Sequence, residues 1–139
     1  MSATRLYTAD ILGLATGLAR YRWNPELPLQ AEARSKACGS AITLGLSLDA
    51  DGAIDVVGVR SQACAIGQAA AAIFADAAKG KTAAQVQEAG GAIARWLLDQ
   101  GEMPDWPGLD AIAAARDYPA RHGALMLPWN AAMQLLPSR

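Results

Sequence analysis

Two cysteines are the residues of this 139-residue chain best suited to chemistry. Cys38 and Cys64 stand 26 positions apart, and His122 is the only histidine. A thiolate is both a nucleophile and a ligand for zinc or an iron–sulfur cluster. A histidine-based zinc site is not indicated, because there is one histidine and no Cys-x-x-Cys pair. The chemistry therefore depends on whether the fold brings the two thiols together.

The sequence between the cysteines predicts a β-hairpin. Residues 42–48 alternate apolar and small or polar side chains, residues 49–52 form a turn signal ending in Gly52, and residues 54–59 are rich in β-branched side chains. A four-residue loop would pair Leu48 with Ala53, whereas a two-residue turn would shift the register by two positions. Either register brings Cys38 opposite positions 63–65, so we expect both cysteines at the open end of the hairpin.

The residues after Cys64 have the composition of a helix. Positions 66–78 are dominated by alanine and other good helix formers. Cys64 is therefore expected at a helix N-terminus, where unpaired N–H groups and the helix dipole favour a thiolate. A free cysteine is often only buried packing, but two cysteines that converge at a strand end and a helix start favour a functional role.

The rest of the chain predicts mainly helices. Amphipathic or helix-forming segments cover residues 5–20, 83–99, 109–116 and 120–136, with Pro128 near the start of the last helix or kinking it, and a weak strand signal lies within 32–37. One hairpin flanked by helices predicts an α+β fold, a small antiparallel sheet with helices packed on one side. We expect residues 1–139 to form a single domain.

The composition limits the partners. The formal net charge is −1, from 12 basic and 13 acidic residues, so no attraction to nucleic acid or to an anionic membrane is indicated. The apolar runs fall far short of the ~20 residues of a membrane span, and the N-terminus lacks a signal-peptide pattern. These features predict a cytoplasmic protein with reduced thiols.

The order of these motifs resembles the U-type iron–sulfur scaffolds, which are the NifU N-terminal domain, IscU and SufU. Residues 37–40, Ala-Cys-Gly-Ser, match the family's first cysteine motif, and residues 63–66, Ala-Cys-Ala-Ile, match its second. Gly-Lys-Thr at 80–82 matches the family's helix-ending motif, and Pro-Ala-Arg at 119–121 is most similar to the SufU branch. The resemblance runs from about residue 7 to 133 and implies the SufE/NifU-like fold.

The sequence departs from the family at the ligands. The family's ligand aspartate is Ser40 here, its third cysteine is Ala124, and the histidine of IscU is Gly123. His122 is one position earlier, which on a helix is a rotation of about 100°. The resemblance therefore leaves Cys38 and Cys64 as metal ligands, with Ser40 and His122 as weaker candidates.

The resemblance implies a role in iron–sulfur cluster assembly, with an Fe–S cluster or zinc as the bound metal and a cysteine desulfurase as partner. A metal normally takes four ligands, so the missing ones could prevent binding. Three interpretations stay open: a divergent scaffold that shares a cluster across a homodimer, a sulfur carrier in which Cys64 accepts persulfide and Cys38 resolves it, and an inactive paralogue that only binds partners. A dithiol redox protein is the alternative outside the family, and whether the chain is an enzyme stays open.

Overall fold

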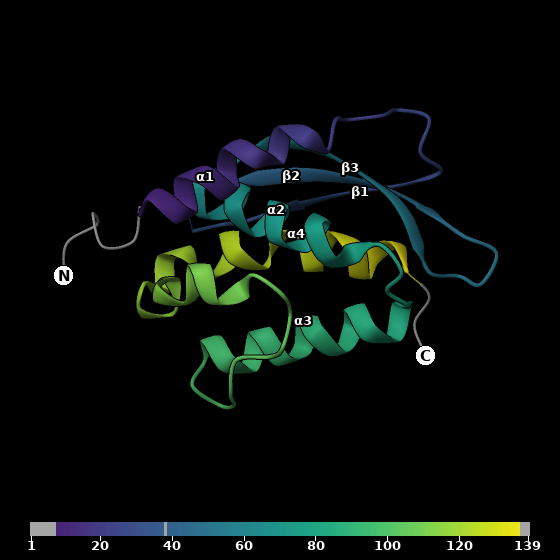
Figure 1. Ribbon diagram of the computed structural model, residues 1–139. Helices are drawn as coiled ribbons and strands as arrows, with labels where there is room; N and C mark the ends of the chain where they lie inside the picture. Colours follow the sequence, from purple (N-terminus) through teal and green to yellow (C-terminus); the bar gives the residue numbers. More distant parts are fainter. Residues whose placement is uncertain (1–7, 38, 137–139) are drawn as a thin grey trace.

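The computed structural model describes residues 8–37 and 39–136 and shows an α+β fold, a three-stranded antiparallel sheet packed against helices (Figure 1). This architecture confirms the predicted fold class. In chain order the elements are α1 (Ala9–Gly17), η2 (Leu18–Arg20), β1 (Leu29–Arg34), β2 (Ala41–Leu48), β3 (Ile54–Gln62), α2 (Ala65–Ala78), α3 (Ala83–Leu97), η3 (Leu109–Asp117), η4 (Pro119–Arg121) and α4 (His122–Leu135). None of the helices in these two ranges is long and apolar enough to cross a membrane.

The predicted hairpin is the β2–β3 pair of a sheet with strand order β1-β2-β3. The strands pair from Ala41 with Gln62 to Ser47 with Val56, and a bulge follows Ser47. This is the register of the two-residue turn, and Gly52 takes a positive φ of 83° in it. Continued past Ala41, the same register would place position 39 opposite Cys64.

The first strand lies earlier than the weak signal at 32–37 indicates. It spans Leu29–Arg34 and pairs antiparallel with β2, from Leu29 opposite Leu46 to Arg34 opposite Ala41. The side-chain amide of Gln134 in α4 donates to the Glu32 carbonyl over 3.1 Å. This edge strand is therefore fixed in part by a helix about a hundred residues away in sequence, which a local pattern cannot show.

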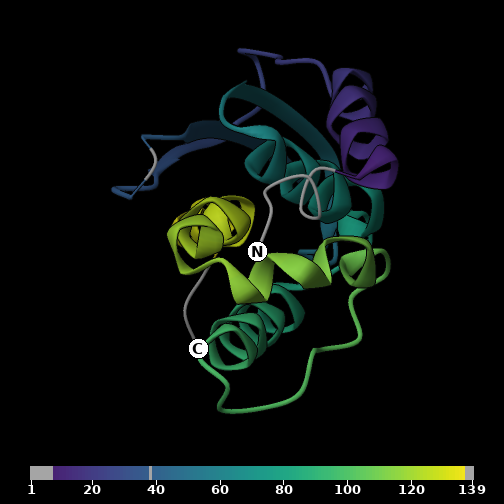
Figure 2. The ribbon, with the colours of Figure 1, turned by 90° about the vertical axis from the view of Figure 1, so that its left-hand side faces the viewer.

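One face of the sheet and helix α2 form the core. Ile42, Leu44 and Leu46 of β2 are at most 1 % exposed and point toward the helices. Helix α2 is buried along most of its length, with α1 and α4 packed against it and α3 packed on the far side of α4 (Figure 2). The molecule thus has a sheet, a middle layer containing α2 and α4, and an outer layer containing α3.

Three aromatic rings join α2 and α4 to the loop that precedes η3. Phe74 stacks on Trp106 with ring centroids 5.6 Å apart, and Trp129 meets both rings edge-on. The Trp106 indole N–H donates to the Ile73 carbonyl over 3.0 Å. The loop that precedes η3 is therefore anchored to α2 by an aromatic side chain with a satisfied polar atom.

The opposite face of the sheet is crossed by the connection between η2 and β1. A Cβ at Gly58 would lie 2.7 Å from the Arg22 carbonyl oxygen, and one at Gly45 would lie 2.9 Å from Cδ1 of Leu27. Both glycines therefore allow the connecting segment to lie directly on the sheet. Helices cover one face of the sheet, as predicted, and this segment covers part of the other.

We expect Gly58→Ala to lower the free energy of unfolding by about 1–3 kcal/mol, because its methyl group would meet rigid backbone. Gly13→Ala is the matched control: Gly13 lies in α1 with nothing within 4 Å of an added Cβ. That change should raise stability by roughly 0.5–1 kcal/mol through helix propensity. Urea denaturation of both variants measures the difference, and equal effects would contradict the proposed close approach at Gly58.

Candidate functional site

Cys64 lies between the end of β3 and the start of α2. It is the N-cap residue of α2, with extended backbone angles (φ −65°, ψ 171°), and its side chain is partly exposed. This is the position that the sequence predicts. At an N-cap, the N–H groups of the first helical turn have no partner within the helix, so they can interact with a negatively charged sulfur.

Ser40 holds the backbone of Cys64 in place. Its hydroxyl oxygen accepts a hydrogen bond from the Cys64 N–H over 3.1 Å, and Ser40 is only 3 % exposed. The Ser40 carbonyl in turn accepts from the Ser35 N–H over 2.7 Å, and the Gly39 N–H donates to the Ser35 carbonyl over 2.9 Å. Backbone hydrogen bonds therefore join Ser35 to Gly39 and Ser40, and Ser40 lies beside Cys64.

The predicted partner thiol, Cys38, lies outside the described residues. Its flanking residue Gly39 adopts a positive φ of 70°. The proximity of Cys38 to Cys64 stays a prediction, based on the hairpin register and the turn on either side of it.

The start of α4 forms another wall of the site. Ala124 is fully buried, and a Cβ at Gly67 in the first turn of α2 would lie 3.7 Å from the Ala124 Cβ. A Cβ at Gly123 would lie 2.7 Å from the Ser35 hydroxyl oxygen. Ala124 and Gly123, which the resemblance aligns with a cysteine and a histidine, therefore lie near the N-terminus of α2 and the Ser35 turn.

The His122 side chain is engaged in a hydrogen bond with the end of η3. Its Nε2 lies 2.7 Å from the Arg116 carbonyl oxygen. A carbonyl only accepts, so Nε2 carries the proton and donates. That nitrogen cannot bind a metal while the hydrogen bond persists, and the role of His122 as a ligand stays a prediction.

The donor set does not fit a metal site within the described part of one chain. No group of three or more His, Cys, Asp or Glu side chains among residues 8–37 and 39–136 is close enough to hold a metal ion. The Ser40 hydroxyl oxygen already accepts from the Cys64 N–H, and Ala124 offers only a methyl group. A tetrahedral site needs four donors, so further ligands would have to come from Cys38, from a rearranged side chain or from another chain.

Two residues that the sequence analysis did not single out also shape the site. The Gln68 side-chain amide donates to the Ala63 carbonyl over 2.9 Å, which ties the end of the strand to the second turn of α2. Ser35 packs against Gly123 and closes the turn before Cys38. No sequence motif marks either residue, since both roles depend on contacts between separate segments.

Comparison with known proteins agrees with this architecture. A family model described as the NifU-like N-terminal domain matches residues 22–123. The crystal structure of a nitrogen-fixing NifU-like protein (N-terminal) from Brucella abortus is 30% identical, with 95% of this chain and 92% of that chain covered at a TM-score of 0.86. A candidate iron–sulfur cluster assembly scaffold protein for the SUF system of Fervidobacterium islandicum AW-1 is 22% identical, with coverage of 98% and 100% and a TM-score of 0.87. No curated protein matches the chain.

We expect Ser40→Ala to destabilise the protein by about 1–3 kcal/mol, because it leaves the Cys64 N–H without its partner at a partly buried position. It should also change the alkylation rate of Cys64 by loosening the start of α2. Ser47→Ala is the matched control, since the Ser47 hydroxyl accepts from the Val56 N–H over 3.2 Å at an exposed position of the same hairpin. The control should cost less than Ser40→Ala and leave Cys64 alkylation unchanged, and an equal response of both variants would contradict the positioning role of Ser40.

Proposed function

Because the chain belongs to the family of the NifU-like N-terminal domain, we propose that it acts in iron–sulfur cluster assembly as a scaffold-like protein that handles sulfur through Cys64 and Cys38. The observation that carries this proposal is the placement of Cys64, a partly exposed thiol at the N-cap of α2. The fold similarity to a NifU-like protein, at 30% identity over nearly the whole chain, supports the process.

The chemistry we propose for Cys64 is acceptance of sulfur from a persulfide. The Cys64 thiolate attacks the terminal sulfur of a donor cysteine persulfide, a new S–S bond forms on Cys64, and the donor S–S bond breaks. The donor cysteine leaves as a thiolate and takes up a proton. The unpaired N–H groups and the dipole of α2 would stabilise the attacking thiolate and the anionic persulfide that results.

Cys38 would resolve the persulfide. Its thiolate attacks the Cys64 sulfur, the terminal sulfur leaves as sulfide, and a Cys38–Cys64 disulfide remains. A cytoplasmic dithiol reductant would return both residues to thiols. The donor we propose is a cysteine desulfurase, because an enzyme of that class forms a cysteine persulfide and the family resemblance implies such a partner.

A second candidate function is supported by the number of possible metal ligands in each chain. Each chain has two cysteines, and the described part of one chain does not assemble three potential metal ligands. A homodimer would supply four thiolates, Cys38 and Cys64 from each copy, to a cluster or a zinc ion carried between the chains. The cluster is then cargo that the assembly process passes on.

Sulfur acceptance is tested by incubating the protein with a cysteine desulfurase and L-cysteine and measuring its intact mass. The wild type should gain the mass of one sulfur atom on Cys64, and Cys64→Ser should gain none. Cys38→Ser is the matched control, since it should accept sulfur and retain it longer without its resolving thiol. Sulfur on neither cysteine would favour the partner-binding paralogue, and a reversible disulfide without any sulfur uptake would favour the dithiol redox protein.

The homodimer is tested by anaerobic reconstitution with iron and sulfide. We expect one cluster per two chains and elution at twice the monomer mass, because four thiolates require two copies. Cys64→Ser should abolish the cluster. A cluster held by a monomer would contradict this stoichiometry, and Ser40→Ala and His122→Ala would then show which of the two remaining candidates supplies a ligand.

A further inference from the structure

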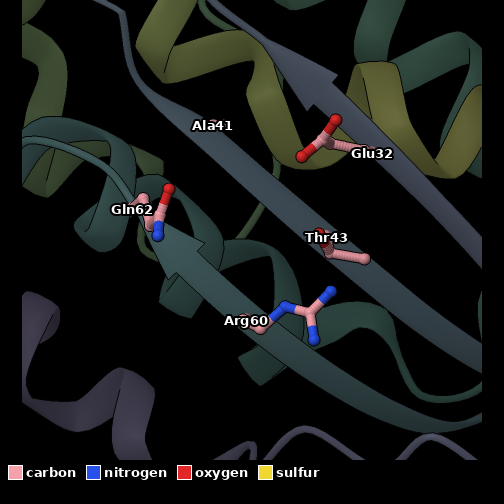
Figure 3. Close-up of a pocket in the computed structure, with 5 residues that line it drawn as sticks. All are labelled: Glu32, Ala41, Thr43, Arg60 and Gln62. Atoms are coloured by element: carbon pink, nitrogen blue, oxygen red, sulfur yellow. The ribbon is translucent and has the colours of Figure 1, made fainter.

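A polar groove of about 290 Å³ lies on the face of the sheet that the helices leave open (Figure 3). It is lined by Glu32, Ala41, Thr43, Arg60 and Gln62. Glu32 pairs with Thr43, and Thr43 pairs with Arg60, so these three residues form one row across the sheet. The volume is at the lower limit of small-molecule pockets, which suits a ligand of a few heavy atoms.

Arg60 forms one wall of the groove, and its cationic guanidinium is held in position by an aromatic ring. Its guanidinium lies 4.8 Å from the centroid of the Trp23 ring. Trp23 in turn lies over Gly45, where an added Cβ would be 3.3 Å from the ring. Within residues 8–37 and 39–136, no carboxylate forms an ion pair with Arg60, so its planar set of donors is available to an anion from outside.

Glu32 forms the opposite wall. Its two carboxylate oxygens accept from Nε and Nη2 of Arg34 over 3.2 and 3.3 Å. A carboxylate offers about four acceptor positions, so further donors can bind. The spacing of neighbouring strands places the Cα atoms of Glu32 and Arg60 roughly 10 Å apart, and both side chains lie on the same open face, on either side of Thr43.

We propose that this groove binds a free α-amino acid, with the ligand carboxylate on Arg60 and the ligand ammonium on Glu32. Arg60 has no carboxylate partner among the described residues, and Glu32 keeps acceptor positions beyond those that Arg34 uses, so a zwitterion can bind both walls at once, whereas a simple anion or a simple cation binds only one. The Thr43 hydroxyl lies between the walls, and the Gln62 amide lines the groove two residues beyond Arg60 on β3, so both supply uncharged hydrogen-bonding groups. Binding does not depend on the sulfur chemistry of Cys64, although Gln62 stands only two residues before it.

The test is a titration of the ¹⁵N-labelled full chain with L-alanine, followed by NMR. Saturable shifts should appear at the Trp23 indole, the Arg60 Nε–H and the amides of Ala41 and Thr43. N-acetyl-L-alanine lacks the ammonium and L-alaninamide lacks the carboxylate, so each should bind at least tenfold more weakly. Cys64→Ser should bind L-alanine as the wild type does, which separates this site from the proposed sulfur transfer.

Two charge variants complete the test. Arg60→Gln and Glu32→Gln should each weaken L-alanine binding at least tenfold while the amide spectrum stays dispersed. Arg20→Gln is the matched control, because Arg20 is an exposed arginine that pairs with Asp76 away from the groove, and binding should not change. The absence of saturable shifts, equal binding of N-acetyl-L-alanine, or shifts centred elsewhere on the protein would each overturn the proposal.

Discussion

The close packing around α2 is the constraint on which the rest of the structure depends. Most of its 14 residues are buried, and the alanines among them let α1, α4 and the sheet approach closely. Ile66, Ile73 and Phe74 supply the larger apolar area that drives the packing. A helix held from several sides cannot slide or rotate easily, so its N-terminus is a fixed point.

The position of Cys64 is fixed by that helix. The hydrogen bond from its N–H to Ser40 then links the helix terminus to the start of β2. Ser40 is almost completely buried, and a neutral hydroxyl at such a position avoids the desolvation cost that a carboxylate would have there. The serine at this position therefore favours a rigid local structure, at the expense of one anionic ligand.

The elements with strong local signals were predictable from the sequence. The hairpin and the helix after Cys64 follow from alternation and composition. The position of β1 was not predictable, because an edge strand with weak alternation takes its register from β2 and α4.

Some features of the candidate site were likewise predictable from the sequence, and others were not. The N-cap position of Cys64 follows from the residues around it, whereas the Ser40 hydrogen bond joins positions 24 apart in sequence and depends on how the hairpin ends. The contacts of Gly123 with Ser35, and of Arg60 with Trp23, likewise arise only when separate segments meet. A local sequence pattern contains no information on contacts between segments that are distant in sequence.

Pro128, inside α4, has a consequence for the site. Proline has no N–H, so the Ala124 carbonyl loses its usual intrahelical partner four residues on. The first turn of α4, which carries Gly123 and Ala124, is thus joined to the rest of its helix by one backbone hydrogen bond fewer than the same turn of a helix without proline. The two sides of the site thus differ: Cys64 caps a helix that is buried along most of its length, and Gly123 and Ala124 lie in the first turn of a helix with a proline inside it.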